Sequence, residues 1–283
     1  MSDLFAPAGA LSDGTDPVCI TPDRAGWTYA GLHVVALEPG ETRRIGLTGV
    51  EAAVVPLEGD CAVEMSGTEF ALTGRASVFD GVPDIAYAPL DTTMTIATET
   101  GGRFAIATSV AEEQREPFKL DASSISIDVR GAGQATRVIN GLLSADVEGP
   151  QRLIVVEVIT PAGNWSSYPP HKHDDWSEHE VPIEEIYYFE ISGENGFGFH
   201  RTYTIDGEID ETVTVRDTDM FLVPRGYHGP CVAAPGYDMY YLNVMSGPDP
   251  QRRWLICNDP AHAWVIDGWP EIEPDPRALE RTR

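Results

Sequence analysis

The clearest strand in the sequence is Glu185-Ile186-Tyr187-Tyr188-Phe189-Glu190-Ile191, a run of β-branched and aromatic residues that favour extended backbone. Side chains two residues apart lie on one face of a strand, so Glu185 shares its face with three apolar side chains. Half-burying a carboxylate among apolar neighbours is costly unless a cation or a hydrogen-bond donor compensates it. The run therefore predicts a core strand that also carries a chemically useful acid.

Short apolar or alternating runs of the same kind occur on both sides of this strand. They are bounded by Gly, Pro or Asp, and no long stretch has the 3.6-residue periodicity of a helix. The runs fall into two series of similar length, within residues 34–107 and residues 152–245. The sequence therefore predicts an all-β protein made of two β-barrel domains, related by internal duplication.

The two series also suggest domain boundaries. We expect a first barrel over residues 1–116, a connector rich in Gly, Ser and Arg over 117–150, and a second barrel over 151–283. The tail of the second barrel carries three tryptophans that we expect to pack against it: Trp254, Trp264 and Trp269. Short strands with many open edges also favour a homo-oligomer.

Composition excludes several classes of partner. The 283 residues carry 45 Asp and Glu against 19 Lys and Arg, a net charge of −26. Such a surface repels phosphate backbones and anionic lipid heads, so neither nucleic acid nor a membrane is expected as a partner. The sequence offers no membrane-spanning run or secretory signal, and its four cysteines are far apart. We therefore expect a cytoplasmic protein.

Histidines concentrate in the second series. His171 and His173 flank Lys172, and on an extended strand both imidazoles face one way while the lysine points away. A strand over 220–223 then leads through a turn to His228, which could approach the same point. A metal ion held by these histidines would compensate the Glu185 carboxylate. Glu178 is the rival acid, at a shorter spacing from His173, but residues 174–182 have the composition of a polar loop.

This ligand pattern resembles the cupin superfamily, whose two motifs supply His, His and Glu from one hairpin and a further His from another. The match covers His171, His173 and Glu185, and the second motif is present as Pro224, Gly226 and His228. The spacing between His173 and Glu185 is longer than usual. In the second motif, Thr218 and Val232 replace the expected glycine and asparagine.

Longer stretches, at residues 164–174, 184–188, 221–228 and 240–245, resemble the 5-deoxy-glucuronate isomerase family of inositol catabolism. The resemblance implies a bicupin fold of two jelly-roll barrels, with one divalent metal ion (Zn, Mn or Fe) in the second barrel. It also implies a metal-dependent aldose–ketose isomerase that converts 5-deoxy-glucuronate to 5-dehydro-2-deoxy-gluconate. The first barrel lacks a His-x-His pair and resembles the degenerate, metal-free half.

An isomerase of this kind needs groups besides the metal ligands. A divalent ion would polarise the carbonyl, and a metal-bound water, a nearby carboxylate or Tyr241 could carry the proton. The small anionic sugar-acid substrate calls for an arginine to bind its carboxylate. Arg225 and Arg201 are the expected candidates for this role, and two arginines of the connector, Arg130 and Arg137, are weaker ones.

Three alternative functions are consistent with the same set of histidines and glutamate. A related cupin, the 4-deoxy-5-threo-hexosulose-uronate ketol-isomerase, would act on a different deoxy-hexuronate. A cupin dioxygenase would place iron in the site and consume oxygen. A non-catalytic sugar-binding cupin would bind a ligand without converting it.

Overall fold

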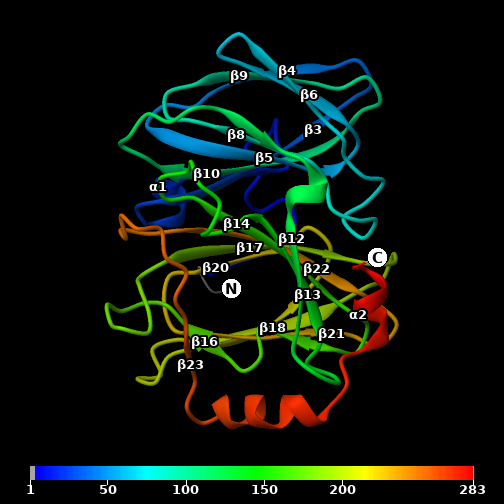
Figure 1. Ribbon diagram of the computed structural model, residues 1–283, viewed down its shortest axis with the longest axis vertical. Helices are drawn as coiled ribbons and strands as arrows, with labels where there is room; N and C mark the ends of the chain where they lie inside the picture. Colours follow the sequence, from blue (N-terminus) through cyan, green and yellow to red (C-terminus); the bar gives the residue numbers. More distant parts are fainter. Residues whose placement is uncertain (1–3, 283) are drawn as a thin grey trace.

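The computed structural model describes residues 4–282, which form two all-β units stacked on each other (Figure 1). The first unit has a six-stranded and a four-stranded sheet, and the second has a seven-stranded and a six-stranded sheet. Each pair of sheets packs face to face as an open sandwich. The all-β expectation is confirmed, although sandwiches take the place of closed barrels.

In the first unit, the larger sheet has the order β11-β8-β5-β10-β3-β2 and the smaller one β4-β9-β6-β7. The larger sheet consists of β2 (Val18–Ile20), β3 (Ala30–Leu37), β5 (Val50–Glu58), β8 (Ile85–Ala88), β10 (Gly102–Val110) and β11 (Phe118–Leu120). The smaller sheet consists of β4 (Thr42–Gly46), β6 (Cys61–Met65), β7 (Thr68–Leu72) and β9 (Thr93–Ala97).

In the second unit, the larger sheet has the order β1-β20-β17-β22-β14-β13-β12. It consists of β1 (Phe5–Ala6), β12 (Ser126–Arg130), β13 (Arg137–Leu143), β14 (Ile154–Thr160), β17 (Glu184–Ile191), β20 (Met220–Val223) and β22 (Met239–Ser246). The outer sheet consists of β15 (Trp165–Ser166), β16 (His171–Lys172), β18 (Gly198–Tyr203), β19 (Asp210–Val215), β21 (Tyr227–Ala233) and β23 (Cys257–Asn258).

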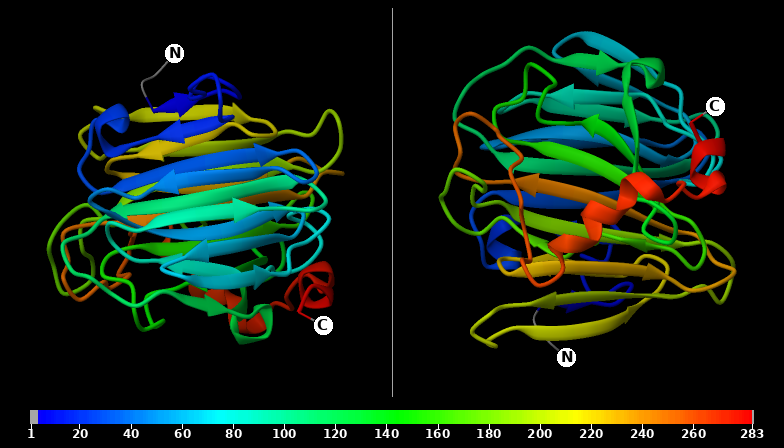
Figure 2. Two further views of the ribbon diagram at one scale, coloured as in Figure 1. Left: turned by 90° about the horizontal axis from the view of Figure 1, so that it is seen from above. Right: turned by 60° about the horizontal axis from the view of Figure 1, so that its bottom comes forward.

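Helices are few and short: α1 (Pro22–Ala25), η1 (Ala122–Ser124), η2 (Ala263–Glu271) and α2 (Pro276–Glu280). Within residues 4–282, none of them has the length and apolar character needed to cross a membrane. The last two belong to the tail, which runs back across the second unit (Figure 2).

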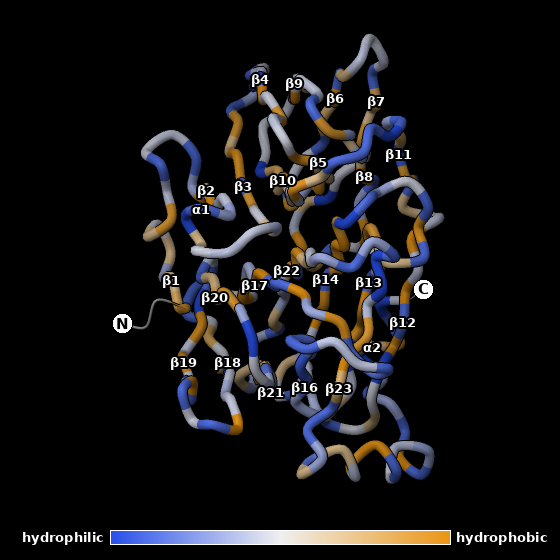
Figure 3. The backbone as a smooth tube through the Cα atoms, turned by 90° about the vertical axis from the view of Figure 1, so that its left-hand side faces the viewer, coloured by the Kyte–Doolittle hydropathy of each residue, from blue (hydrophilic) through white to orange (hydrophobic). Residues whose placement is uncertain are grey.

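The core has three apolar layers. One fills the first sandwich, a second fills the second sandwich, and a third lies between the two larger sheets. This third layer combines side chains of both units, such as Leu32 and Val34 with Tyr188 and Leu242. Hydrophobic residues accordingly follow the strands, while hydrophilic ones gather in the connecting loops (Figure 3). The central strands of both larger sheets are therefore buried on two faces.

The duplication is visible in the pairing of strands. The order β3-β10-β5-β8 in the first unit matches β14-β22-β17-β20 in the second. Glu51, at the start of β5, accepts hydrogen bonds from the backbone N–H groups of residues 151–153, just before β14. Glu184, at the start of β17, accepts three from residues 28–30, just before β3. Each unit thus holds the other by an equivalent carboxylate.

Replacing Glu51 by alanine should destabilise the protein by about 3 kcal/mol or more, because three buried N–H groups lose a charged acceptor. Glu51 is fully buried and also accepts a hydrogen bond from the Tyr87 hydroxyl at 2.6 Å. Glu184 is only half-buried, so in Glu184→Ala water replaces part of what is lost and the effect should be smaller. Urea denaturation of both variants measures the difference, and equal losses would contradict this account.

The expected domain boundaries need correction. Residues 117–150 are not a connector, because β11 joins the first unit while β12 and β13 join the second. The pair Asn140-Gly141 resembles a turn in sequence, yet it lies inside β13 at a register shift. At the other end of the chain, β1 pairs with β20 of the second unit, Phe5 opposite Phe221. Both units therefore contain residues that the sequence assigned elsewhere.

Candidate metal centre

Three histidines converge inside the second unit from neighbouring strands of its outer sheet. His171 in β16 lies directly opposite His228 in β21, and their ring centroids are 4.4 Å apart. His173 is two residues further on and presents its ring to the same side, 4.7 Å from that of His228. The three side chains offer ligand atoms that all lie within 4.8 Å of one another, which is close enough to hold one metal ion.

Glu185 reaches this cluster from the opposite sheet, where it begins the buried part of β17. Its Oε2 lies 2.8 Å from His173 Nε2 and 3.1 Å from His228 Nε2. Its rival Glu178 is exposed in the loop. The structure therefore brings Glu185, and not Glu178, to the three histidines.

Backbone carbonyls orient two of the rings. His173 Nδ1 donates to Ile183 O at 3.0 Å, and His228 Nδ1 donates to Gly226 O at 3.1 Å. Such bonds fix the tautomer and leave Nε2 free to bind a metal. Among the described residues, His228 Nε2 is buried without a hydrogen bond of acceptable geometry, an orphaned polar atom that a metal ion would satisfy.

The charges of the cluster suit a cation. Burial opposes ionisation of Glu185, but the imidazoles of His228 and His173 outweigh it and hold the pKa of this carboxyl well below its usual range. Burial, reinforced by His228, keeps the pKa of His171 well below its ordinary value. An ionised carboxylate and a neutral imidazole are the forms that bind metals.

A cavity of about 170 Å³ opens beside the cluster. His171, Glu185 and Tyr241 line it together with Asn243 of β22 and Trp254 of the tail. Asn243 Nδ2 and Trp254 Nε1 are buried and have no hydrogen-bond partner within residues 4–282. Two residues of the cavity wall therefore carry a donor that no group of residues 4–282 satisfies.

The tail forms part of the wall of this cavity. Trp254, Ile256, Ile266 and Trp269 belong to its lining, and the segment from β23 to α2 crosses the second unit (Figure 2). Two of the three expected tryptophan anchors thus face the site. Trp264 does not, because it lies on the outer side of η2 with 67% of its surface exposed.

The structure does not bring the two expected arginines to the cavity. Arg201 pairs with Asp210 at 2.9 Å, and Arg225 pairs with Glu208 and Asp206, all on the surface. Arg201 shares a strand face with aromatic residues, as expected, but that face is the outer one. Arg137, a weaker candidate in the sequence, lines the cavity instead.

Lys172 lies where strand alternation predicts, and Tyr241, one of the expected proton carriers, lies at the cavity. The Tyr241 hydroxyl faces the cavity and shares a hydrogen bond of 3.1 Å with Ser167 Oγ. Burial raises the pKa of this phenol far above its ordinary value. Lys172 points away from the histidines, and its Nζ contacts Asp174 at 2.6 Å and Glu180 at 2.7 Å. These two ion pairs stabilise the loop that precedes Glu185.

Sequence reasoning missed Asn243 and did not place Trp254 at the site. A signal for Asn243 was available, because it alternates with Tyr241 and Met245 along β22. A polar residue on an apolar strand face is the same feature that singled out Glu185. No comparable signal marks Trp254, because the tail has no regular pattern.

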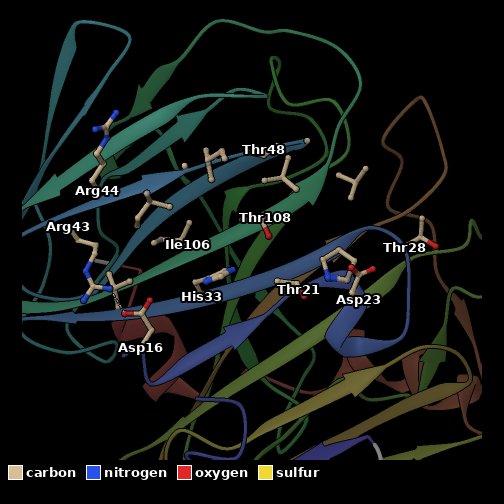
Figure 4. A pocket seen from close by; sticks show the side chains of 18 of the residues that line it. Asp16, Thr21, Asp23, Thr28, His33, Arg43, Arg44, Thr48, Ile106 and Thr108 are labelled. Atoms are coloured by element: carbon tan, nitrogen blue, oxygen red, sulfur yellow. Dashed lines mark hydrogen bonds and ion pairs between the residues drawn. The ribbon is translucent and has the colours of Figure 1, made fainter. Parts of the chain in front are cut away.

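The first unit has a larger cavity of about 780 Å³ but no metal cluster among its described residues. His33 and Thr108 project into it from β3 and β10, and Arg43 is paired with Asp16 at 2.6 Å (Figure 4). By strand register, Ala52 occupies the position equivalent to Glu185. The metal-ligand set is therefore confined to the second unit.

The stacked sandwiches and the histidine-rich cluster inside one of them define a protein of the cupin class. The chain belongs to the KduI/IolB family, whose profile matches residues 4–265. The family resemblance inferred from the sequence is thereby confirmed.

Individual proteins agree with this assignment. A 5-deoxy-glucuronate isomerase from Geobacillus kaustophilus (strain HTA426) is 38% identical over 270 residues, covering 94% of this chain and 96% of the relative. The crystal structure of an IolB-like protein from Salmonella typhimurium LT2 superposes with a TM-score of 0.88 at 32% identity, covering 94% of this chain and 100% of the other. Oxalate decarboxylase OxdC of Bacillus subtilis shares the fold alone, with a TM-score of 0.63 and 12% identity, covering 91% and 80%.

Proposed function

We propose that this protein is a metal-dependent aldose–ketose isomerase that converts 5-deoxy-glucuronate to 5-dehydro-2-deoxy-gluconate in inositol catabolism. The observation that carries the proposal is the convergence of three imidazoles and one carboxylate beside a small cavity. The relatives named for this activity, at 38–40% identity, support the choice of substrate.

One divalent ion would be held by His171, His173, His228 and Glu185, and when bound it would polarise the substrate carbonyl. Three nitrogens and one oxygen suit first-row ions such as Zn, Mn or Fe. This donor set leaves coordination positions open for a ligand. Metal analysis of the purified protein decides between these ions.

The remaining cavity residues have roles in binding and proton transfer. Isomerisation moves a proton between neighbouring carbons while carbonyl and hydroxyl exchange places, so it needs a base to take the proton from carbon and an acid to protonate the substrate oxygen. The Tyr241 hydroxyl, kept protonated by burial and linked to Ser167, can serve as that acid. The free donors Asn243 Nδ2 and Trp254 Nε1 can bind substrate hydroxyls.

Replacing Tyr241 by phenylalanine should lower kcat by about 10²–10⁴-fold, the range for loss of a general acid or base. The ring remains and only the hydroxyl is lost, so bound metal should not change. Steady-state kinetics with metal analysis of the same sample measures both quantities. If kcat of Tyr241→Phe were unchanged, a group other than Tyr241 would carry out the proton transfer.

The alternatives are separated by one assay. Under argon, the purified protein with its metal should convert 5-deoxy-glucuronate, with NMR following loss of the aldehyde signal. A dioxygenase would be silent under argon and would consume oxygen in air. A binding protein would retain the sugar acid unchanged, and a ketol-isomerase of another deoxy-hexuronate would prefer that substrate. Any of these three results would overturn the proposal.

The proposal also covers the cellular compartment and the oligomeric state of the enzyme. All four cysteines are free, which supports the reducing cytoplasm as its compartment. The open sheet edges support a homo-oligomer. Light scattering of the purified protein measures the number of subunits.

A further inference from the structure

Arg137 has an unusual position at the cavity wall. It begins β13 and is 7% exposed. Its Nη1 donates to Ala135 O at 3.1 Å and to Tyr168 O at 3.2 Å. Its guanidinium carbon lies 5.8 Å from the centre of the Trp269 ring, under the tail. These contacts fix the guanidinium in place but do not neutralise its charge.

Within residues 4–282, no carboxylate lies within ion-pair distance of Arg137, and its Nε and Nη2 make no hydrogen bond. The other buried arginines differ. Arg75 is paired with Glu157 at 2.8 Å. Arg252 donates hydrogen bonds from its guanidinium to backbone carbonyls. In a chain with 45 acidic residues, a buried arginine without an acid is a cost that an anionic ligand would remove.

The cavity joins this charge to the metal cluster. Arg137, His171 and Tyr241 all line the same space of about 170 Å³. Burial is the main reason that the pKa of Arg137 falls to about 10, and its charge also acts on His171 and Tyr241. A space of this size lies below the roughly 300–1,000 Å³ of pockets for drug-sized ligands, and so suits one small molecule.

We infer that Arg137 binds the carboxylate of the substrate and so directs its carbonyl end to the three histidines. The planar guanidinium has two unused donor groups, which match the two oxygens of a carboxylate. The inference rests on the proposed function and narrows it, because the site then selects open-chain sugars with an acid at one end. Neutral aldoses and polyols are rejected, since they leave the arginine unpaired.

The test uses Arg137→Met, which keeps much of the side-chain volume and removes the charge. Arg201→Met is the matched control, because Arg201 lies on the surface outside the cavity and is paired with Asp210 at 2.9 Å. Binding of gluconate and of the neutral polyol sorbitol to the metal-loaded proteins is measured by calorimetry. Metal content and the KM for 5-deoxy-glucuronate are measured on the same samples.

We expect wild type and Arg201→Met to prefer gluconate over sorbitol, and Arg137→Met to lose that preference while retaining its metal. The KM of Arg137→Met should rise by about 10- to 150-fold, as for the loss of charged hydrogen bonds. An Arg137→Met protein that still prefers gluconate like wild type would overturn the inference.

If Arg137→Met does not fold, Arg137→Lys carries the test. It keeps the charge but not the paired donors, and it should weaken gluconate binding without affecting sorbitol. Unchanged gluconate binding in Arg137→Lys would then overturn the inference. The comparison of gluconate and sorbitol binding requires no turnover. If the wild type lacked isomerase activity, the proposed function would be wrong, but the binding data would still test the role of Arg137.

Discussion

Replacing His171 by alanine should remove most of the bound metal and lower isomerase activity by at least about 10²–10³-fold, the loss seen when one electrostatic stabiliser is removed. His171 makes no side-chain hydrogen bond within residues 4–282, so its ring serves the cluster and not the fold. It faces His228 across the strand pair β16–β21. The thermal midpoint of the metal-free variant should match that of the metal-free wild type.

His179→Ala is the matched control. His179 is close in sequence but exposed in the loop, so this variant should keep its metal and its activity. Metal analysis and anaerobic turnover of both variants measure the effect. If His171→Ala retained full metal and full activity, the three-histidine cluster would not be the active centre.

Replacing Arg75 by alanine should destabilise the protein by about 3–5 kcal/mol, the penalty for leaving a buried charge without its partner. Arg75 belongs to the first unit and Glu157 to the second. Their two hydrogen bonds of 3.0 and 2.8 Å lie in the interface, with side chains 1% and 0% exposed. Asn140 and Tyr240 also donate to Glu157, so the variant leaves a whole network short of positive charge.

The control for this prediction is Arg115→Ala. The ion pair of Arg115 with Glu113 is exposed, and such pairs contribute little to stability. Urea denaturation of the metal-free proteins should show a large shift for Arg75→Ala and almost none for Arg115→Ala. Equal midpoints would mean that the Arg75–Glu157 pair does not help to hold the two units together.

The parts of the site that sequence could predict depend on strand alternation. Alternation put His171 and His173 on one face, turned Lys172 away, and marked Glu185 as an acid on an apolar strand face. These inferences need only local geometry, because the side-chain period of a strand is fixed. The apolar runs predicted the all-β fold for the same reason.

The parts that sequence could not predict depend on which strand faces become interior. Arg201 lies among aromatic residues, yet that face of β18 is the outer one, and alternation alone cannot tell the two faces apart. The Asn140-Gly141 pair resembles a turn, but both residues pair with β12, opposite Ile127 and Ser126, and so lie within β13. The reciprocal positions of Glu51 and Glu184 become visible only when the strand orders of the two larger sheets are compared.

The most direct measurement is a titration of divalent ion into chelator-treated protein, with bound metal and anaerobic conversion of 5-deoxy-glucuronate recorded at each step. Activity should be absent without metal, rise in proportion to bound ion, and reach its maximum at one ion per chain. Full turnover by the metal-free protein, or metal bound with no turnover at any step, would contradict the assignment of His171, His173, Glu185 and His228 as an isomerase centre.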